Sequence, residues 1–332
     1  MIVYYFKEDS RNVTEFYYNI ILDAINKKGL ECVAIEKCTI ISALSIKKED
    51  YVLVTTLRSF LILYLVGLRH FIFWYQGITP EEVYLMKKSR FWYYVYSYLE
   101  KLSLKTVEYK IGVSKYMFEH YKHKYKIRFS NDSFFIMPCF NSNINKNSFM
   151  TPQKYYKNIF CYAGGTQVWQ GLDKILQIYS IIEKQREDVY LKIFSKDVET
   201  AKKMVAQADL KHYSIQCVPQ SEMDRALSDC KFGFIIREDN IINNVATPTK
   251  MGTYLANGVI PIFSSSIYSF RDLSHSYEYL CCVDETNVIE KILSVIKKEI
   301  DCLSVYDEYQ RIFSDYYNRE AYSEKLSAFL NI

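Results

Sequence analysis

The sequence has few of the residue patterns that build metal centres, disulfide frameworks or nucleic-acid surfaces. Its nine cysteines are scattered, none forms a C-x-x-C pair, and no histidine stands at ligand spacing from a cysteine pair. This pattern argues against a metal site and is typical of reduced, buried thiols in a cytosolic protein. The net charge is only +4, which does not suggest a nucleic-acid binder, because such a protein would carry a strong basic patch.

Long apolar runs are also missing. The most apolar stretch, 59–68, is bounded by Arg58 and by Arg69-His70, and it is too short to cross a bilayer. The N-terminus, MIVYYFKEDSR, has the pattern of a strand followed by charge, so we expect no signal peptide. Glycine and proline are few (10 and 6) and tyrosine is abundant (31). An AT-rich genome explains that bias, which is also compatible with tyrosines that stack on sugars.

A chain of 332 residues predicts two domains, at about 150 residues each. Strands are expected at 2–6, 33–35, 51–55, 71–75, 110–113 and 134–137, with helices at 14–27, 89–106 and from 115. After a polar linker candidate at 141–157, strands recur at 158–162, 190–194, 214–218, 232–236 and 259–263. The two alternations predict two parallel sheets, divided as 1–145, 146–315 and a terminal helix within 316–332.

The stretch 245–263, VATPTKMGTYLANGVIPIF, is the most informative part of the chain. Pro248 suits the approach to a helix, Thr247 and Thr249 are candidate N-caps, and Gly258 stands where the helix should end. A helix start beside the carboxyl ends of parallel strands favours phosphate. Lys250 is unfavourable for the helix dipole, and an anionic ligand would explain its place there.

The same stretch resembles the nucleotide-sugar segment of retaining GT-B glycosyltransferases, which contain two Rossmann-like domains that face a cleft and a C-terminal helix that crosses back to the first domain. The matching residues are Thr247, Pro248, Lys250, Tyr254, Leu255, Ala256, Gly258 and Ile262. The resemblance departs at the two glutamates of the family's E-x7-E pair, which fall on Val245 and Thr253. Glu238 and Asp239 lie just upstream as alternatives.

A second match is the glycine loop after the strand at 158–162, where Gly164 and Gly165 precede a helix. Glycine lets the backbone approach a phosphate closely, although a plain tight turn is an equal alternative. The family's basic residues in this loop fall on Thr166 and Gln170. The resemblance therefore implies a donor site made of these positions together with Arg237, Glu238, Asn240, Thr249, Lys250, Met251 and Thr253.

The acceptor side is expected in the first domain, where Gln76-Gly77 ends a strand. Gln76 hydrogen-bonds but cannot titrate. Glu81 and Glu82 either serve the acceptor hydroxyl or simply begin a helix. Ordered matches at 111–117 and 138–141 extend the resemblance over about 250 residues. The catalytic candidates are thus Gln76, Glu81 and Lys250.

These observations predict a cytoplasmic glycosyltransferase that moves a sugar from a nucleotide diphosphate sugar to a glycan or polyprenyl-linked acceptor of a bacterial surface or capsular polysaccharide. No cofactor, metal or nucleic acid is expected. The basic and aromatic segment 87–105 either contacts the inner face of the membrane or forms a buried helix. A catalytically weakened GT-B partner or sugar-binding subunit is the alternative, whereas an oxidoreductase is disfavoured because no dinucleotide fingerprint follows a strand.

Overall fold

The computed structural model describes residues 1–9, 14–129 and 133–332. The chain divides into two units. Unit 1 contains Met1–Asn141, Asn244–Thr247 and Asn318–Ile332, and unit 2 contains Ser142–Asn243 and Pro248–Tyr317. The short return of Asn244–Thr247 to unit 1 differs from the continuous division expected from the sequence.

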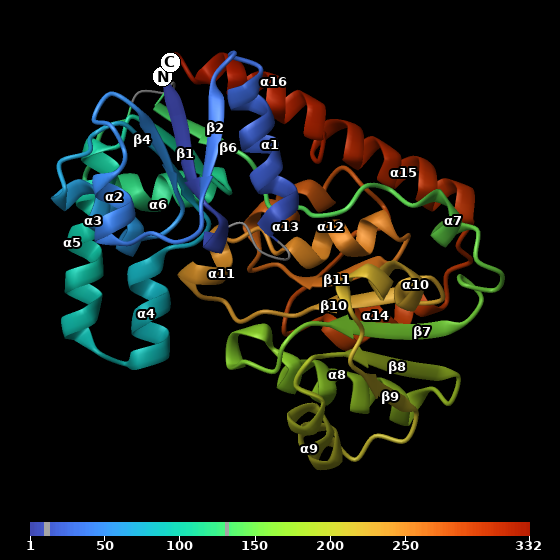
Figure 1. Ribbon diagram of the computed structural model, residues 1–332. Helices are drawn as coiled ribbons and strands as arrows, with labels where there is room; N and C mark the ends of the chain where they lie inside the picture. Colours follow the sequence, from blue (N-terminus) through green and yellow to red (C-terminus); the bar gives the residue numbers. More distant parts are fainter. Residues whose placement is uncertain (10–13, 130–132) are drawn as a thin grey trace. The chain divides into compact units, whose positions relative to one another are not determined.

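Unit 1 is built on a six-stranded parallel sheet with the order β2-β1-β3-β4-β5-β6 (Figure 1). Its strands are β1 (Ile2–Phe6), β2 (Glu31–Ile35), β3 (Tyr51–Val54), β4 (Phe71–Tyr75), β5 (Tyr109–Gly112) and β6 (Phe134–Ile136). Its helices are α1 (Glu15–Asn26), α2 (Ile40–Leu44), α3 (Leu57–Leu65), α4 (Thr79–Lys87), α5 (Arg90–Thr106), α6 (Lys115–Tyr125) and α16 (Arg319–Phe329). The fully buried strands β3 and β4 are typical of a parallel sheet covered on both faces.

Unit 2 repeats this plan with the strand order β12-β11-β10-β7-β8-β9, also parallel. The strands are β7 (Asn158–Ala163), β8 (Val189–Phe194), β9 (Tyr213–Gln216), β10 (Phe232–Ile235), β11 (Ile260–Ser264) and β12 (Cys281–Val283). The helices are α7 (Lys146–Phe149), α8 (Leu172–Gln185), α9 (Val198–Ala208), α10 (Met223–Leu227), α12 (Thr249–Ala256), α13 (Tyr268–Ser274), α14 (Val288–Ile296) and α15 (Cys302–Asp315), and α11 (Ile241–Val245) leads into the return to unit 1. The expected two parallel α/β sheets are confirmed.

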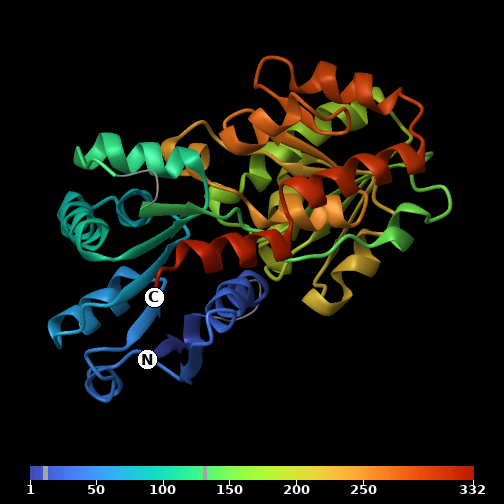
Figure 2. The same ribbon diagram turned by 90° about the horizontal axis from the view of Figure 1, so that it is seen from above.

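The terminal helix α16 packs on α1 inside unit 1, where the red and dark blue helices lie side by side (Figure 2). Arg319 Nη2 lies 2.7 Å from the carboxylate of Asp23 on α1. The segment that precedes it, α15, belongs to unit 2. The last fifteen residues, Asn318–Ile332, therefore belong to the unit of the first sheet rather than the second.

The helices α6 and α12 begin with different caps. Ser114 caps α6, since its hydroxyl accepts from Met117 N at 3.0 Å, and it donates to Val245 O at 2.6 Å. Neither threonine caps α12: the N-cap is Pro248, and Thr247 Oγ1 instead accepts from Cys139 N. Proline fits this position because its fixed φ suits a helix start.

The linker candidate at 141–157 is packed into unit 2 at two places, around residues 148–149 and 154–155. It contains the short helix α7, and Lys154 is buried with its ammonium group donating to Ser148 O and Asn257 O. Part of this polar segment is thus buried by hydrogen bonding, while about half of its residues remain exposed, as expected of a linker.

Gly258 ends α12 as predicted, at φ +66°, and an added Cβ would lie 2.7 Å from Tyr155 Oη and 2.8 Å from a ring carbon of Phe149. We expect Gly258→Ala to lower the free energy of unfolding by about 3 kcal/mol, from left-handed strain plus crowding. Gly29 is the matched control, because it has φ +75° but open space around it, so Gly29→Ala should cost only about 1–2 kcal/mol. Equal losses in urea unfolding would refute the packing contribution.

Candidate active site

The carboxyl edge of the second sheet brings a glycine loop next to a helix start. Because β7 and β10 are neighbours, the residues that follow them, Gly164 and Arg237, lie at the same edge. Gly164 has no room for a side chain, since an added Cβ would lie 2.5 Å from Lys250 Nζ and 2.9 Å from Tyr162 Oη. Lys250, in the first turn of α12, is thus placed directly against the glycine loop.

The loop is held by hydrogen bonds from both sides. Tyr162 Oη donates to Gly165 O at 2.5 Å, and the hydroxyl of Thr166 lies 3.2 Å from Asp197 Oδ2. Arg237 donates to Trp169 O and, at 3.1 Å, to Gln170 Oε1. Gln170, where the family carries a basic residue, therefore orients a cation from the neighbouring strand instead of supplying one.

Two cations, Lys250 and Arg237, lie at this edge of the sheet. Lys250 Nζ lies 4.2 Å from the centre of the Tyr162 ring, and neither Lys250 nor Arg237 forms an ion pair with any carboxylate of the described residues. Arg237 Nε is buried and has no hydrogen-bond partner among those residues. An unpaired buried charge is costly, so this arrangement favours an anion.

The absence of a neutralising carboxylate among the described residues also affects the pKa values of the two side chains. Burial lowers the pKa of Lys250 well below its usual value, and the charge of Arg237 lowers it further. Burial also lowers the pKa of Arg237. An anion bound between them would favour both charged forms.

The other predicted donor residues fall into two groups. Glu238 lies near this edge but is half-exposed and 3.6 Å from Lys174, and Asn240 Oδ1 accepts from Asn243 N within its own loop. Met251 is fully buried and belongs to the core. Thr253 is buried too, with its hydroxyl 3.4 Å from Thr249 O, one turn along α12. Tyr162 and Trp169 were not singled out from the sequence, because only their loop partners distinguish them.

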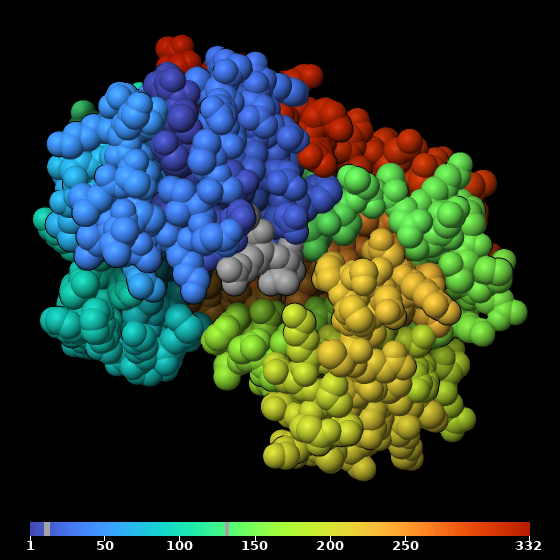
Figure 3. Space-filling view, viewed as in Figure 1, coloured from blue at the N-terminus to red at the C-terminus, as the bar shows by residue number. Residues whose placement is uncertain are grey.

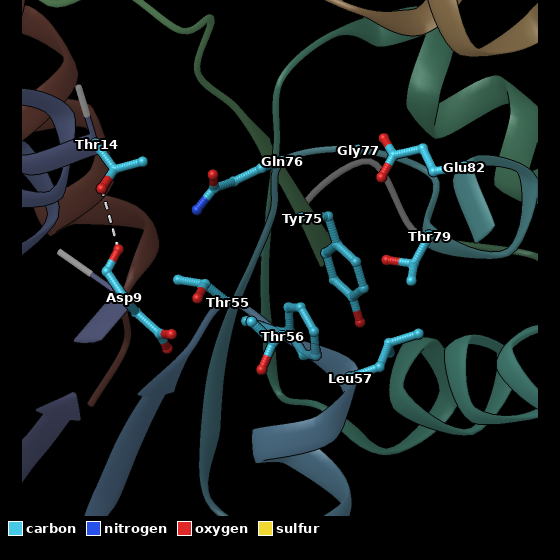
Figure 4. A pocket seen from close by; sticks show the side chains of 11 residues that line it. Asp9, Thr14, Thr55, Thr56, Leu57, Tyr75, Gln76, Gly77, Thr79 and Glu82 are labelled. Atoms are coloured by element: carbon cyan, nitrogen blue, oxygen red, sulfur yellow. Dashed lines mark hydrogen bonds between the residues drawn. The ribbon is translucent and has the colours of Figure 1, made fainter. Parts of the chain in front are cut away.

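Unit 1 has a cavity of about 260 Å³ at the carboxyl ends of β1, β3 and β4 (Figure 4). Three neighbouring strands deliver Asp9, Thr55 and Gln76 to its wall, and Glu82 and Thr79 come from α4. Its charged lining side chains are both acidic, and burial raises the pKa of Asp9 and of Glu82. Such a wall suits the hydroxyl groups of an uncharged ligand.

The two adjacent glutamates of α4 point to different surroundings. Glu82 lines the cavity and lies over Gly77. Glu81 instead lies 2.8 Å from Lys124 and 3.4 Å from His120, and all three are largely buried. Burial alone raises the pKa of Glu81, but His120 and Lys124 outweigh it and leave that pKa lowered. Of the two, the structure brings Glu82 and not Glu81 to Gln76.

No protein-family model and no curated protein matches the chain, but solved structures do. HepE from Anabaena, crystallised with UDP-glucose, superposes with a TM-score of 0.72 over 99% of both chains at 8% identity. TarM from S. aureus gives 0.68 at 12% identity over 88% of this chain, which spans only 58% of TarM. A trehalose 6-phosphate synthase from Burkholderia multivorans gives 0.62 at 10% identity, over 96% of this chain and 77% of the synthase. These neighbours are GT-B glycosyltransferases, and the chain has their two-sheet α/β fold.

Proposed function

We propose that this protein is a glycosyltransferase that moves a sugar from a nucleoside diphosphate sugar to a hydroxyl of a bacterial surface polysaccharide precursor. The observation that carries the proposal is the pair Lys250 and Arg237, which lies at a glycine loop and a helix start and is neutralised by no carboxylate in the part of the chain that the structure describes. Two neighbours were crystallised with UDP, one of them also with UDP-glucose, which supports a uridine nucleotide as the donor.

The chemistry that this site offers is stabilisation of the leaving group. When the sugar departs, negative charge develops on the diphosphate, and fixed cations and helix N–H groups that face it lower the barrier. In this chain Lys250 would supply one charge, and Arg237, oriented by Gln170 and Trp169 O, the other. Thr166 and Thr249 add hydroxyl groups nearby.

The acceptor is proposed to occupy the cavity of unit 1. Gln76 and Glu82 would orient its hydroxyl, and Asp9 and the threonines would bind the rest of the ring. Retention of anomeric configuration, a polyprenyl-linked acceptor and work at the inner face of the cell membrane are further parts of the proposal, and they follow from the family resemblance.

Nucleotide binding should depend on Lys250. We expect Lys250→Met to weaken UDP binding by about 1.5–3 kcal/mol through loss of a charge-assisted hydrogen bond. Because the pKa of Lys250 is depressed in the free protein, binding should take up a proton, and affinity should fall as pH rises above that depressed pKa. Calorimetry in two buffers of different ionisation enthalpy measures both effects.

The matched control is Lys231, a buried lysine at the amino end of β10, whereas Arg237 follows the carboxyl end of the same strand. Lys231→Met should change stability and leave UDP affinity within twofold or so of the parent. Unchanged affinity and proton uptake in Lys250→Met would remove Lys250 from the donor site.

The acceptor assignment separates the two glutamates of α4. We expect Gln76→Ala and Glu82→Gln to lower the transfer rate about tenfold or more, through lost hydrogen bonds to the acceptor, with UDP affinity preserved. Glu81→Gln should instead lower the melting temperature, because it removes one of the two carboxylates that pair with the largely buried Lys124. The assignment fails if Glu82→Gln turns over like the parent while keeping its stability.

Transfer should need no divalent metal, because Lys250 and Arg237 supply positive charge at the diphosphate. Activity measured with UDP-sugars in excess EDTA should equal that in buffer alone. Complete loss in EDTA with recovery in Mn²⁺ would contradict this part of the proposal and assign the neutralising charge to an ion.

A further inference from the structure

The hairpin formed by α4 and α5 carries large apolar side chains into solvent. At its outer end and along α5, Met86, Phe91, Tyr94 and Tyr98 are each more than half exposed, with Phe91 at 68% and Tyr94 at 67%. In the space-filling view the teal hairpin stands at the edge of unit 1 (Figure 3). Exposed apolar side chains that gather in one place mark an interaction surface.

Ring contacts join neighbouring side chains at the end of the hairpin in pairs. Tyr84 packs edge-on against Tyr93, with 5.9 Å between ring centres, and Phe91 packs against Trp92 at 5.3 Å. Lys87 Nζ lies 5.0 Å from the centre of the Trp92 ring. We call this patch, from Tyr84 to Tyr94, the hairpin tip.

The charge around the hairpin tip has one sign. Lys87, Lys88 and Arg90 are all exposed. From residue 51 to 107 the acidic side chains are Glu81, Glu82 and Glu100, and none of the three is exposed. Glu100 is turned inward, where its carboxylate accepts from Tyr125 Oη at 2.6 Å and lies 3.2 Å from Lys124. The outer surface therefore combines aromatic rings with uncompensated positive charge.

The inner face of α5 fixes this orientation. Besides Glu100, the helix buries Ser103, whose hydroxyl accepts from Tyr75 Oη at 2.9 Å, and Leu104. Rotating α5 to bury its aromatic face would break these contacts. The aromatic face is thus exposed because the opposite face of α5 is packed into unit 1, while the described residues of unit 1 leave the aromatic face uncovered.

We propose that the hairpin tip docks on the surface of a bilayer that contains anionic lipids. Tryptophan and tyrosine prefer the headgroup region, Phe91 and Met86 would enter the acyl boundary, and the three cations would meet anionic headgroups. A second copy of the chain is a poor occupant, since it would bring two positive patches together. No helix of the described residues is long and apolar enough to span a membrane, and docking at the surface requires none.

Vesicle binding tests the docking proposal without any measurement of transfer activity. The docking proposal can therefore fail while the transferase assignment stands, and the transferase assignment can fail while the docking proposal stands. The full chain should cosediment with vesicles of equimolar phosphatidylcholine and phosphatidylglycerol and bind phosphatidylcholine vesicles at least tenfold more weakly. The double variant Lys87→Glu, Arg90→Glu should lower partitioning to the anionic vesicles about twentyfold or more, at roughly fivefold per basic residue. Phe91→Ser should lower it as well.

The controls change similar side chains elsewhere. Lys203→Glu on α9 and Tyr156→Ser in unit 2 alter an exposed lysine and an 89% exposed tyrosine, and both should bind like the parent. Depth is measured by fluorescence quenching with brominated lipid. The chain has three tryptophans, of which Trp74 is buried and Trp92 and Trp169 are 41% and 39% exposed. Trp92→Phe should abolish quenching and Trp169→Phe should preserve it.

Equal binding to both kinds of vesicle, binding that the tip variants do not change, or quenching that survives Trp92→Phe would overturn the proposal. So would self-association in the absence of lipid that Phe91→Ser abolishes, because the patch would then be an interface between copies.

Discussion

Lys250 and Arg237 are two partly buried cations that share one edge of a parallel sheet, and no described carboxylate pairs with either. Their placement depends on Gly164, which leaves room for the lysine, and on Gln170 and Trp169, which hold the guanidinium. Isolated charges of this kind cost stability. An anionic ligand bound between them would offset this loss of stability. The first turn of α12 adds backbone N–H groups that can bind the same ligand.

The two units differ in the chemistry of their sheet edges. Unit 2 presents positive charge, whereas the cavity of unit 1 is lined by hydroxyl groups, an amide and two carboxyls with raised pKa. The proposed transfer would need one site for an anionic diphosphate and another for an uncharged sugar hydroxyl. The same α/β plan can supply both kinds of site, because parallel strands deliver different side chains to equivalent carboxyl ends.

Features that arise from local sequence could be predicted. The pattern around Pro248 and Gly258 gave α12 and its C-terminal stop, and alternating apolar runs gave both sheets. Features set by tertiary packing could not. Glu81 and Glu82 are neighbours in sequence, and only the positions of Lys124 and Gly77 separate a buried ion pair from a cavity wall. The return of Asn244–Thr247 to unit 1 rests on bonds to Ser114 and Cys139, more than a hundred residues away.

A crystal structure of the protein with UDP tests the central claim most directly. The diphosphate should lie between Gly164-Gly165 and the first turn of α12, with phosphate oxygens about 2.7–2.9 Å from Lys250 Nζ and from an Arg237 nitrogen. A nucleotide bound elsewhere, or one whose phosphates avoid both cations, would contradict the account.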